Sequence, residues 1–191
     1  MLKLKLILGS TRPNRTSEKL VPWLTDSILK KGGFEIEVLD LRDHALPFYD
    51  QATTPSQVKD GNYPTDAAKA WAAKIADGDV FLIISPEYNH SFTAVLKNAL
   101  DTVYAEWNNK AVGFVGYGSA MGARAIEQLR IVAAELQMAS VRQGVYIPAP
   151  WALTDEKGAL KDGVLEQHTP ALNTLLEQLA SWGSALATTR K

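Results

Sequence analysis

The sequence predicts an α/β fold in which helices cover both faces of one parallel sheet. Short β-prone segments alternate with helical segments along the chain. Residues 79–84 (DVFLII) form an apolar run without alternation, which is typical of a strand covered on both faces. Apolar residues make up 46% and charged residues 21% of 191 positions, as in ordinary globular proteins. We therefore expect a single domain over residues 1–191.

The composition excludes several classes of protein. Twenty Lys and Arg against 21 Asp and Glu leave a net charge of −1, so the chain has no overall basic field for nucleic acid. The absence of cysteine excludes disulfides, thiolate zinc sites and a cysteine nucleophile. The apolar run at 80–84 is too short to span a bilayer. The N-terminal stretch MLKLKLILGS is charged within its first apolar stretch and lacks the apolar h-region of a signal peptide. We expect a cytoplasmic protein without nucleic-acid or membrane partners.

The first half of the chain contains two strands and a helix before a long loop. Residues 3–8 are β-prone, and apolar residues at helical spacing begin near Ser17 and end at Gly32-Gly33. Residues 34–39 alternate apolar and polar, as in a half-buried strand. Residues 43–64 are rich in Pro, Thr, Asp and Asn and predict a loop, whose length favours a functional role.

The second half continues the alternation of helices and strands. The expected helices span residues 66–76, 93–107, 120–138 and 169–186, and the expected strands span 79–84, 110–115 and 140–147. Five strands that alternate with five helices, joined by right-handed crossovers, fit the flavodoxin-like order 2-1-3-4-5. The prediction is a flavodoxin-like three-layer sandwich with a five-stranded parallel sheet.

Three polar or glycine-rich loops leave the carboxyl ends of the first, third and fourth expected strands. They span residues 9–17, 85–91 and 116–124. Ligands of open α/β sheets bind beyond the carboxyl ends of the strands, at the point where the strand order reverses. The topology brings all three loops to that point, so we expect the functional site there.

The loop at 9–17 has the composition of a phosphate site. It offers hydroxyls, two arginines (Arg12 and Arg15) and the free N–H groups of a helix start. GxxxxGK[ST] is absent, so it is not a Walker A motif. The alternative is a simple helix cap, with Thr16 or Ser17 as the capping residue and both arginines in solvent.

The other two loops favour a flat ligand. Residues 116–122 read G-x-G-x-x-x-G after the fourth strand, which does not match the GxGxxG dinucleotide fingerprint. A glycine-rich turn lets a flat ring approach the backbone, although it also serves as a tight turn without a ligand. In the loop at 85–91, Tyr88, Asn89 and His90 offer a ring, an amide and an imidazole, and ordinary packing is the alternative for Tyr88.

The stretches GSTRPNRTSEK (9–19), PEYNHSFTAVLKNALD (86–101) and GYGSAMGARA (116–125) resemble the NADPH-dependent FMN reductase family. The resemblance extends over about residues 3–147. It implies a non-covalently bound FMN that NADPH or NADH reduces as co-substrate. It further implies that quinones, free flavin, azo compounds or metal oxyanions reoxidise the flavin.

The resemblance also assigns residues to the cofactor, in three groups. The phosphate group would be Ser10, Arg12, Arg15, Thr16 and Ser17; the ring and ribityl group Pro86, Glu87, Tyr88, Asn89 and Ser91; and the third-loop group Gly118 and Ser119. No catalytic side chain is expected, because the flavin itself accepts the electrons. A metal site is not expected either, since the three histidines share no i,i+3 or i,i+4 spacing.

Further expectations concern assembly and substrates. The family resemblance implies a homodimer or homotetramer, formed through the helix after PEYN. Arg124 and Lys110 are candidate cations for the 2′-phosphate of NADPH, and the alternative for Arg124 is that it orients the third loop or binds a carboxylate. Trp151 is a candidate to line a substrate pocket. The candidate interface residues on the helix after PEYN, which core packing explains equally well, are Phe92, Leu96, Leu100, Val103 and Trp107.

Two other functions remain open from the sequence. A flavodoxin-type electron carrier would bind FMN but react only with protein partners, and a flavin-dependent regulatory protein would show little turnover. Direct oxidation of NAD(P)H without a partner protein distinguishes the reductase from both.

Overall fold

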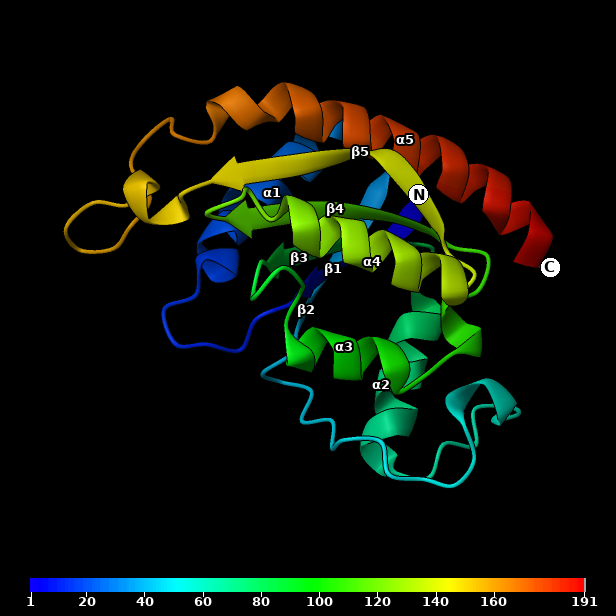
Figure 1. The fold of residues 1–191 in the computed structure, drawn as a ribbon. Coiled ribbons are helices and arrows are strands. Elements are labelled where there is room, and N and C mark those ends of the chain that lie inside the picture. The colour runs from blue at the N-terminus through cyan, green and yellow to red at the C-terminus, as the bar shows by residue number, and fades with distance from the viewer. Residues whose placement is uncertain (191) are drawn as a thin grey trace.

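The computed structural model describes residues 1–190, and its strands form one parallel sheet in the order β2-β1-β3-β4-β5. Figure 1 shows the twisted sheet with its carboxyl ends on one side of the molecule. The predicted strand order is confirmed. The strands are β1 (Leu2–Leu8), β2 (Phe34–Asp40), β3 (Val80–Pro86), β4 (Ala111–Gly118) and β5 (Ala139–Pro148).

Helices cover both faces of the sheet, as Figure 1 shows. The helices are α1 (Thr16–Lys31), α2 (Asp66–Asp77), α3 (Ala94–Asp101), α4 (Ala123–Glu135) and α5 (Thr169–Ala187). Side chains of β3 alternate between two hydrophobic cores. Phe81 and Ile83 pack with α2, α3 and α4, whereas Leu82 and Ile84 pack with α1 and α5. All four are fully buried, which explains the unbroken apolar run in the sequence.

Two predicted helices are shorter in the structure. The helix expected over 93–107 ends at Asp101, because Trp107 turns inward and its indole N–H donates to the Leu100 carbonyl at 3.2 Å. The helix expected over 120–138 begins at Ala123 and ends at Glu135. Gly122 and Gln137, with φ of +73° and +55°, bound it in the left-handed region.

The expected dimer surface on α3 belongs mostly to the core. Leu96, Leu100, Val103 and Trp107 are at most 1% exposed and pack against the chain's own sheet, and Phe92 is partly buried against the same cluster. The prediction that these side chains form a subunit interface is therefore wrong for the four buried residues. The helical spacing of these residues in the sequence reflects their burial against the sheet and not a subunit interface.

The long segment at 43–64 is attached to the α2–α3 side of the molecule. Tyr63 is buried, and its hydroxyl donates to Glu106 at 2.6 Å and accepts from the Tyr104 N–H at 3.1 Å. The Asn98 side-chain amide on α3 donates to the Leu46 carbonyl at 3.0 Å. These bonds hold both ends of the segment against the helices.

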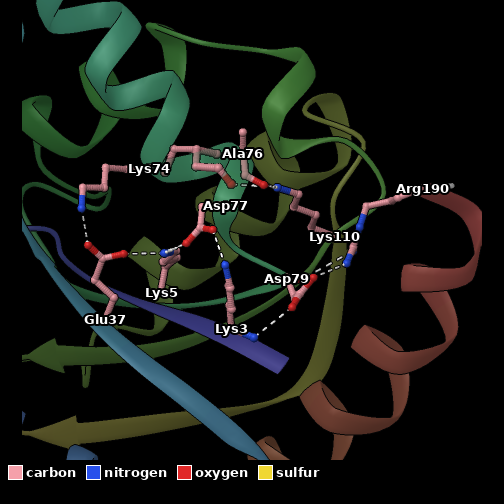
Figure 2. Close-up of polar contacts among 10 residues, drawn as sticks. Lys3, Lys5, Glu37, Lys74, Ala76, Asp77, Asp79, Lys110 and Arg190 are labelled. Carbon is pink, nitrogen blue, oxygen red and sulfur yellow. Dashed lines mark hydrogen bonds and ion pairs between the residues drawn. The ribbon is translucent and has the colours of Figure 1, made fainter. Parts of the chain in front are cut away.

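A network of charged side chains joins β1, β2 and α2 (Figure 2). The Lys5 ammonium is almost completely buried, contacts Asp77 at 2.6 Å and pairs with Glu37. Lys3 also pairs with Asp77, and Lys74 also pairs with Glu37, each with a nitrogen–oxygen distance of 2.5 Å. The buried lysine is therefore compensated by carboxylates that themselves remain partly in solvent.

Lys110 closes the carboxyl end of α2 in the same region (Figure 2). It lies just before β4 and donates to the carbonyls of Ile75 and Ala76 at 2.7 and 2.9 Å. A cation at this end of a helix satisfies orphan carbonyls and complements the helix dipole. Burial lowers the pKa of Lys110 to about 8.

Replacing Lys5 should change the acid sensitivity of the fold. Hydrogen bonds from Lys3 and Lys5 lower the pKa of Asp77 to about 2, and bonds from Lys5 and Lys74 lower the pKa of Glu37. Carboxylates with lowered folded-state pKa values stabilise the fold above their unfolded pKa of about 4, and this stabilisation is lost as pH falls through the folded value. Lys5→Met should therefore be less stable than wild type at pH 7, and the gap should narrow between about pH 4 and pH 2.

Urea unfolding across pH 2 to 7 measures this gap. Lys97→Met is the matched control, because Lys97 pairs with Asp101 on the exposed surface of α3. Exposed pairs contribute about 0–1 kcal/mol, so its unfolding free energy should stay close to wild type throughout. If the difference in unfolding free energy between wild type and Lys5→Met stays constant with pH, the network does not contribute to the pH dependence of stability.

Candidate functional site

The three predicted loops meet at the carboxyl edge of β1, β3 and β4, around a cavity of about 290 Å³. Figure 1 shows the loops after these strands, and the one after β5, on this side. Nine of the predicted residues line the cavity: Ser10, Arg12, Arg15, Thr16, Pro86, Glu87, Tyr88, Gly118 and Ser119. Its lining also includes Pro13, Asn14, Tyr117, Pro150 and Trp151, but not the predicted Ser17, Asn89 and Ser91.

A larger hollow of about 780 Å³ lies elsewhere, between α1, residues 160–166 and the start of α5. Both lysine and acidic side chains line this hollow. Lys31 Nζ lies 2.6 Å from Glu177 Oε1. None of the residues that line it comes from 9–17, 85–91 or 116–124. We therefore place the functional site at the smaller cavity, where the switch point of the sheet lies.

The amino end of α1 offers unpaired donors at one end of the cavity. Among residues 1–190 no side chain caps this helix, whereas Thr65 and Thr93 cap α2 and α3. The buried Ser17 hydroxyl also has no hydrogen-bond partner in the described chain. Neither Thr16 nor Ser17 acts as the cap, so the simple capping alternative is wrong. Free N–H groups, a helix dipole and an orphan hydroxyl suit an anion such as phosphate.

Arg15 is not available as a free phosphate ligand. Its side chain is 1% exposed and bidentate to Asp40, with Nη1 2.8 Å from Oδ1, and it also donates to the Ser10 carbonyl. Burial alone would raise the pKa of Asp40, but hydrogen bonds from Arg15 and Arg42 outweigh it and hold this pKa well below its usual range. Both groups are therefore charged. Arg15 fixes the shape of the first loop.

Arg12 is the exposed guanidinium of the first loop. It donates to the Tyr88 hydroxyl at 3.5 Å, and no carboxylate among residues 1–190 forms an ion pair with it. The family resemblance assigns both arginines to the phosphate, because nothing in the loop itself distinguishes them. The distinguishing signal lies at Asp40, the last residue of the neighbouring strand β2.

The second loop is a two-residue hairpin. Tyr88 and Ser91 exchange backbone hydrogen bonds of 2.8 and 2.9 Å across Asn89 and His90. Asn89 and His90 have φ of +47° and +68°, as a type I′ turn requires at both central positions. Asn-His lacks the usual glycine, which is why the sequence did not indicate this turn. It places Asn89 at an exposed tip outside the cavity lining, so its contact with the cofactor stays a prediction, as does that of Ser91.

Glu87 joins the second loop to the third. Its side chain is 4% exposed and accepts from the Arg124 backbone N–H at 3.1 Å and from Arg124 Nε at 2.5 Å. Arg124 Nη1 in turn lies 2.6 Å from His90 Nε2. This clamp confirms the alternative expected for Arg124, namely that it orients the third loop or binds a carboxylate. It neutralises Arg124, and Lys110 lies buried below α2, so the assignment of Lys110 to a nucleotide phosphate is wrong.

The third loop is a tight turn that only glycine allows. Gly122 has φ of +73°, and a Cβ on it would lie 2.4 Å from the Tyr117 nitrogen. Its carbonyl accepts from the Ile126 N–H at 3.0 Å, which starts α4 directly after the turn. The glycine therefore brings the start of α4 against the end of β4, beside the cavity.

Residues beyond β5 complete the wall of the cavity. The Ala149 N–H donates to the Gly118 carbonyl at 3.0 Å, and Pro150 is buried behind it. Trp151 follows with its side chain 64% exposed. Tyr117 closes the floor, and burial raises the pKa of its hydroxyl. Trp151 lines the cavity, as the sequence predicted for a substrate pocket, because the sheet order places β5 next to β4.

Two further classes of site find no support in residues 1–190. These residues contain no cluster of three His, Asp or Glu side chains that could hold a metal ion. Within the same range, no helix combines the length and the apolar character needed to cross a bilayer.

Gly122→Ala should lower the stability of the fold by about 2–4 kcal/mol, because backbone strain and the clash with Tyr117 add together. Gly61→Ala is the matched control, since Gly61 has φ of +65° but open space around it. The free energy of unfolding of the control should fall by only about 1–2 kcal/mol, because alanine is strained at this φ but meets no neighbouring atom. Equal losses in urea unfolding would show that the turn yields without cost.

Comparisons with known proteins agree with this geometry. The family model described as NADPH-dependent FMN reductase matches residues 2–152. An NAD(P)H-dependent FMN reductase of Schizosaccharomyces pombe is 34% identical over 164 residues, which cover 86% of this chain and 78% of that protein. A 2-hydroxy-1,4-benzoquinone reductase of a Burkholderia species is 32% identical over 189 residues, which cover 95% and 96%.

A solved structure shows the same fold at lower identity. The flavoenzyme NAD(P)H:(acceptor) oxidoreductase FerB of Paracoccus denitrificans superposes with a TM-score of 0.73 and 21% identity, over 97% of this chain and 98% of that one. The sheet order, the loops at its carboxyl edge and the match over most of the sequence lead to one conclusion: the chain belongs to the NADPH-dependent FMN reductase family.

Proposed function

We propose that this chain is an FMN-dependent NAD(P)H oxidoreductase that passes reducing equivalents to a small-molecule acceptor. One observation carries the proposal. The cavity at the switch point has unpaired donors of α1 at one end and the aromatic side chains of Tyr88 and Tyr117 in its lining. A phosphate end and a flat aromatic end match the two ends of FMN.

The residues present fit this cofactor. The orphan Ser17 hydroxyl, the uncapped amino end of α1 and the exposed Arg12 would hold the phosphate, together with Ser10 and Thr16. Pro86, Tyr88, Gly118 and Ser119 would border the ring system. When bound, FMN takes a hydride from the nicotinamide and gives it up to the acceptor.

The protein's own contribution is to bind and orient. The Glu87 carboxylate is engaged by Arg124 and therefore does not serve as a mobile proton carrier. Burial raises the pKa of Tyr117, so its hydroxyl stays protonated near neutral pH. The clamp between Glu87 and Arg124 holds two cavity loops in one arrangement. A preformed cavity keeps the reacting partners in position without ordering costs at each turnover.

Quinones are the acceptor class that we propose first. The Burkholderia relative is named a 2-hydroxy-1,4-benzoquinone reductase and matches this chain over nearly its whole length. An open cavity with aromatic walls also suits a flat ring. The electron-carrier alternative has less support, because the family's description names NADPH as a reactant.

We also propose a homodimer, in which side chains other than the buried ones of α3 form the contact. Ile131 on α4 is 63% exposed and Met121 in the third loop is 44% exposed. A subunit contact would remove these two apolar side chains from water. Sedimentation equilibrium measures the mass, and a monomer at all concentrations would contradict the dimer.

The direct test follows the absorption of the FMN-loaded protein under anaerobic conditions while NADPH and then NADH are added. Rapid bleaching of the flavin bands is the expected result, and the faster donor gives the nucleotide preference. Flavin bands that persist with both donors would favour an electron carrier or regulatory protein. Failure to retain FMN would contradict the assignment of the cavity.

Arg12→Ala should weaken FMN binding about 10-fold to 150-fold, because a hydrogen bond from a charged donor contributes about 1.5–3 kcal/mol. Hydride transfer in the FMN-saturated variant should change less than about threefold, since Arg12 is assigned to the phosphate and not to the reacting ring. Fluorescence titration gives the FMN Kd, and stopped-flow bleaching gives the rate.

Arg142→Ala serves as the control for Arg12, because Arg142 is an exposed arginine on β5 away from the cavity. It makes the same change in net charge and should leave the FMN Kd unchanged. A slower hydride transfer in saturated Arg12→Ala, with an unaltered FMN Kd, would place Arg12 at the ring instead.

A further inference from the structure

Trp151 is a large apolar side chain that the fold leaves open to solvent at the cavity. It lines the cavity with Tyr88 and Ser119 and is 64% exposed. Trp71 and Trp107 differ completely, because both are fully buried and donate their indole N–H to the Ala99 and Leu100 carbonyls. Folding therefore accounts for those two indoles and gains little from Trp151.

The backbone holds Trp151 in place. Ala149, two residues earlier, has φ of +39° and ψ of +58°, a left-handed conformation that is unfavourable for a residue other than glycine. The Ala149 N–H is bonded to Gly118, and the Ala149 carbonyl accepts from the Ala152 N–H at 2.8 Å. The Trp151 carbonyl accepts from the Thr154 hydroxyl at 3.1 Å. Strained backbone that surrounding bonds maintain is common where a side chain is presented to a ligand.

The position of Trp151 differs from that of the expected cofactor ligands. It lies beyond β5, whereas the proposed phosphate and ring contacts come from the loops after β1, β3 and β4. It also sits at the exposed part of the wall, where an incoming molecule arrives from solvent. An exposed indole at this point can contact the acceptor without being needed to retain FMN.

We propose that Trp151 determines acceptor specificity by stacking its indole on the flat ring of the acceptor. This inference rests on the proposed function. An aromatic pair strengthens binding about twofold to tenfold beyond the burial of its area, so Trp151 favours planar quinones over acceptors without a flat ring. NAD(P)H supplies two electrons and a proton to the quinone, solvent supplies the second proton, and hydroquinone and NAD(P)⁺ leave.

The test compares a flat acceptor with one that cannot stack. Menadione is the flat quinone, and ferricyanide is a compact octahedral ion, of which two take one electron each per NAD(P)H. Trp151→Ala should raise the KM for menadione about fivefold to tenfold, with ferricyanide reduction and the FMN Kd unchanged. Trp151→Phe should restore the menadione KM to within about twofold of wild type.

A second readout does not depend on turnover. Anthraquinone-2-sulfonate is titrated into the oxidised, FMN-loaded protein without NAD(P)H, and its Kd should rise in Trp151→Ala to the same degree as the menadione KM. Trp182→Ala is the matched control, because Trp182 is a 46% exposed tryptophan on α5 and does not line the cavity. It should leave both quantities unchanged.

The outcomes separate this inference from the proposed function. In one outcome, the wild type reduces ferricyanide, but Trp151→Ala keeps a normal menadione KM and a normal Kd for anthraquinone-2-sulfonate. This result would overturn the role of Trp151 and leave the proposed function intact. A raised FMN Kd in Trp151→Ala would overturn this role as well, because the indole would then hold the cofactor. Wild type that fails to oxidise NAD(P)H with either acceptor would overturn the proposed function, and the role of Trp151 with it.

Discussion

The adjacency of β1 and β3 in a parallel sheet is the constraint on which the rest of this molecule depends. From β1 the chain turns to α1 on one face, and from β3 it turns to α3 on the other face. The loops therefore diverge at the carboxyl edge and leave a crevice that no helix fills. The cavity, the free amino end of α1 and the aromatic wall all follow from that divergence. A different strand order would separate the same residues.

Ion pairs then give the crevice its shape. Arg15 with Asp40 ties the first loop to β2, and Glu87 with Arg124 ties the second loop to α4. Each pair is largely desolvated on at least one side, so breaking it would leave a buried charge without a partner. These charges are used to hold loops and are therefore unavailable to a ligand. Arg12 remains as the exposed guanidinium of the first loop, which concentrates anion recognition at one point.

Stability and recognition occupy opposite regions of the sheet. The lysines and carboxylates around Lys5 and Lys110 join β1, β2 and α2 and close the end of that helix (Figure 2). The cavity lies at the other ends of the strands, among turns with φ in the left-handed region at Asn89, His90, Gly122 and Ala149. Backbone strain of this kind persists only because the buried central strands β3 and β4 support the turns. The two regions can thus vary independently.

The sequence by itself determined the element types, the strand order and the edge at which the site lies. The spacing of apolar residues, the apolar runs and the positions of glycines are local signals that predict the elements. A parallel sheet with right-handed crossovers then allows few arrangements of five strands. Nine of the predicted site residues line the cavity for the same reason, since each lies in a loop whose strand places it there. The ends of α3 and α4 were less well predicted, because Trp107 and Gly122 act through contacts that spacing does not reveal.

Only the tertiary structure decided which polar residues are free. Arg12 and Arg15 are equivalent along the chain, and the distinction arises because Asp40 lies beside one of them. The pairing of Glu87 with Arg124 and the arrival of Trp151 at the cavity likewise join segments far apart in sequence. Charge compensation and exposure are properties of neighbours in space, and a linear pattern lists only neighbours along the chain.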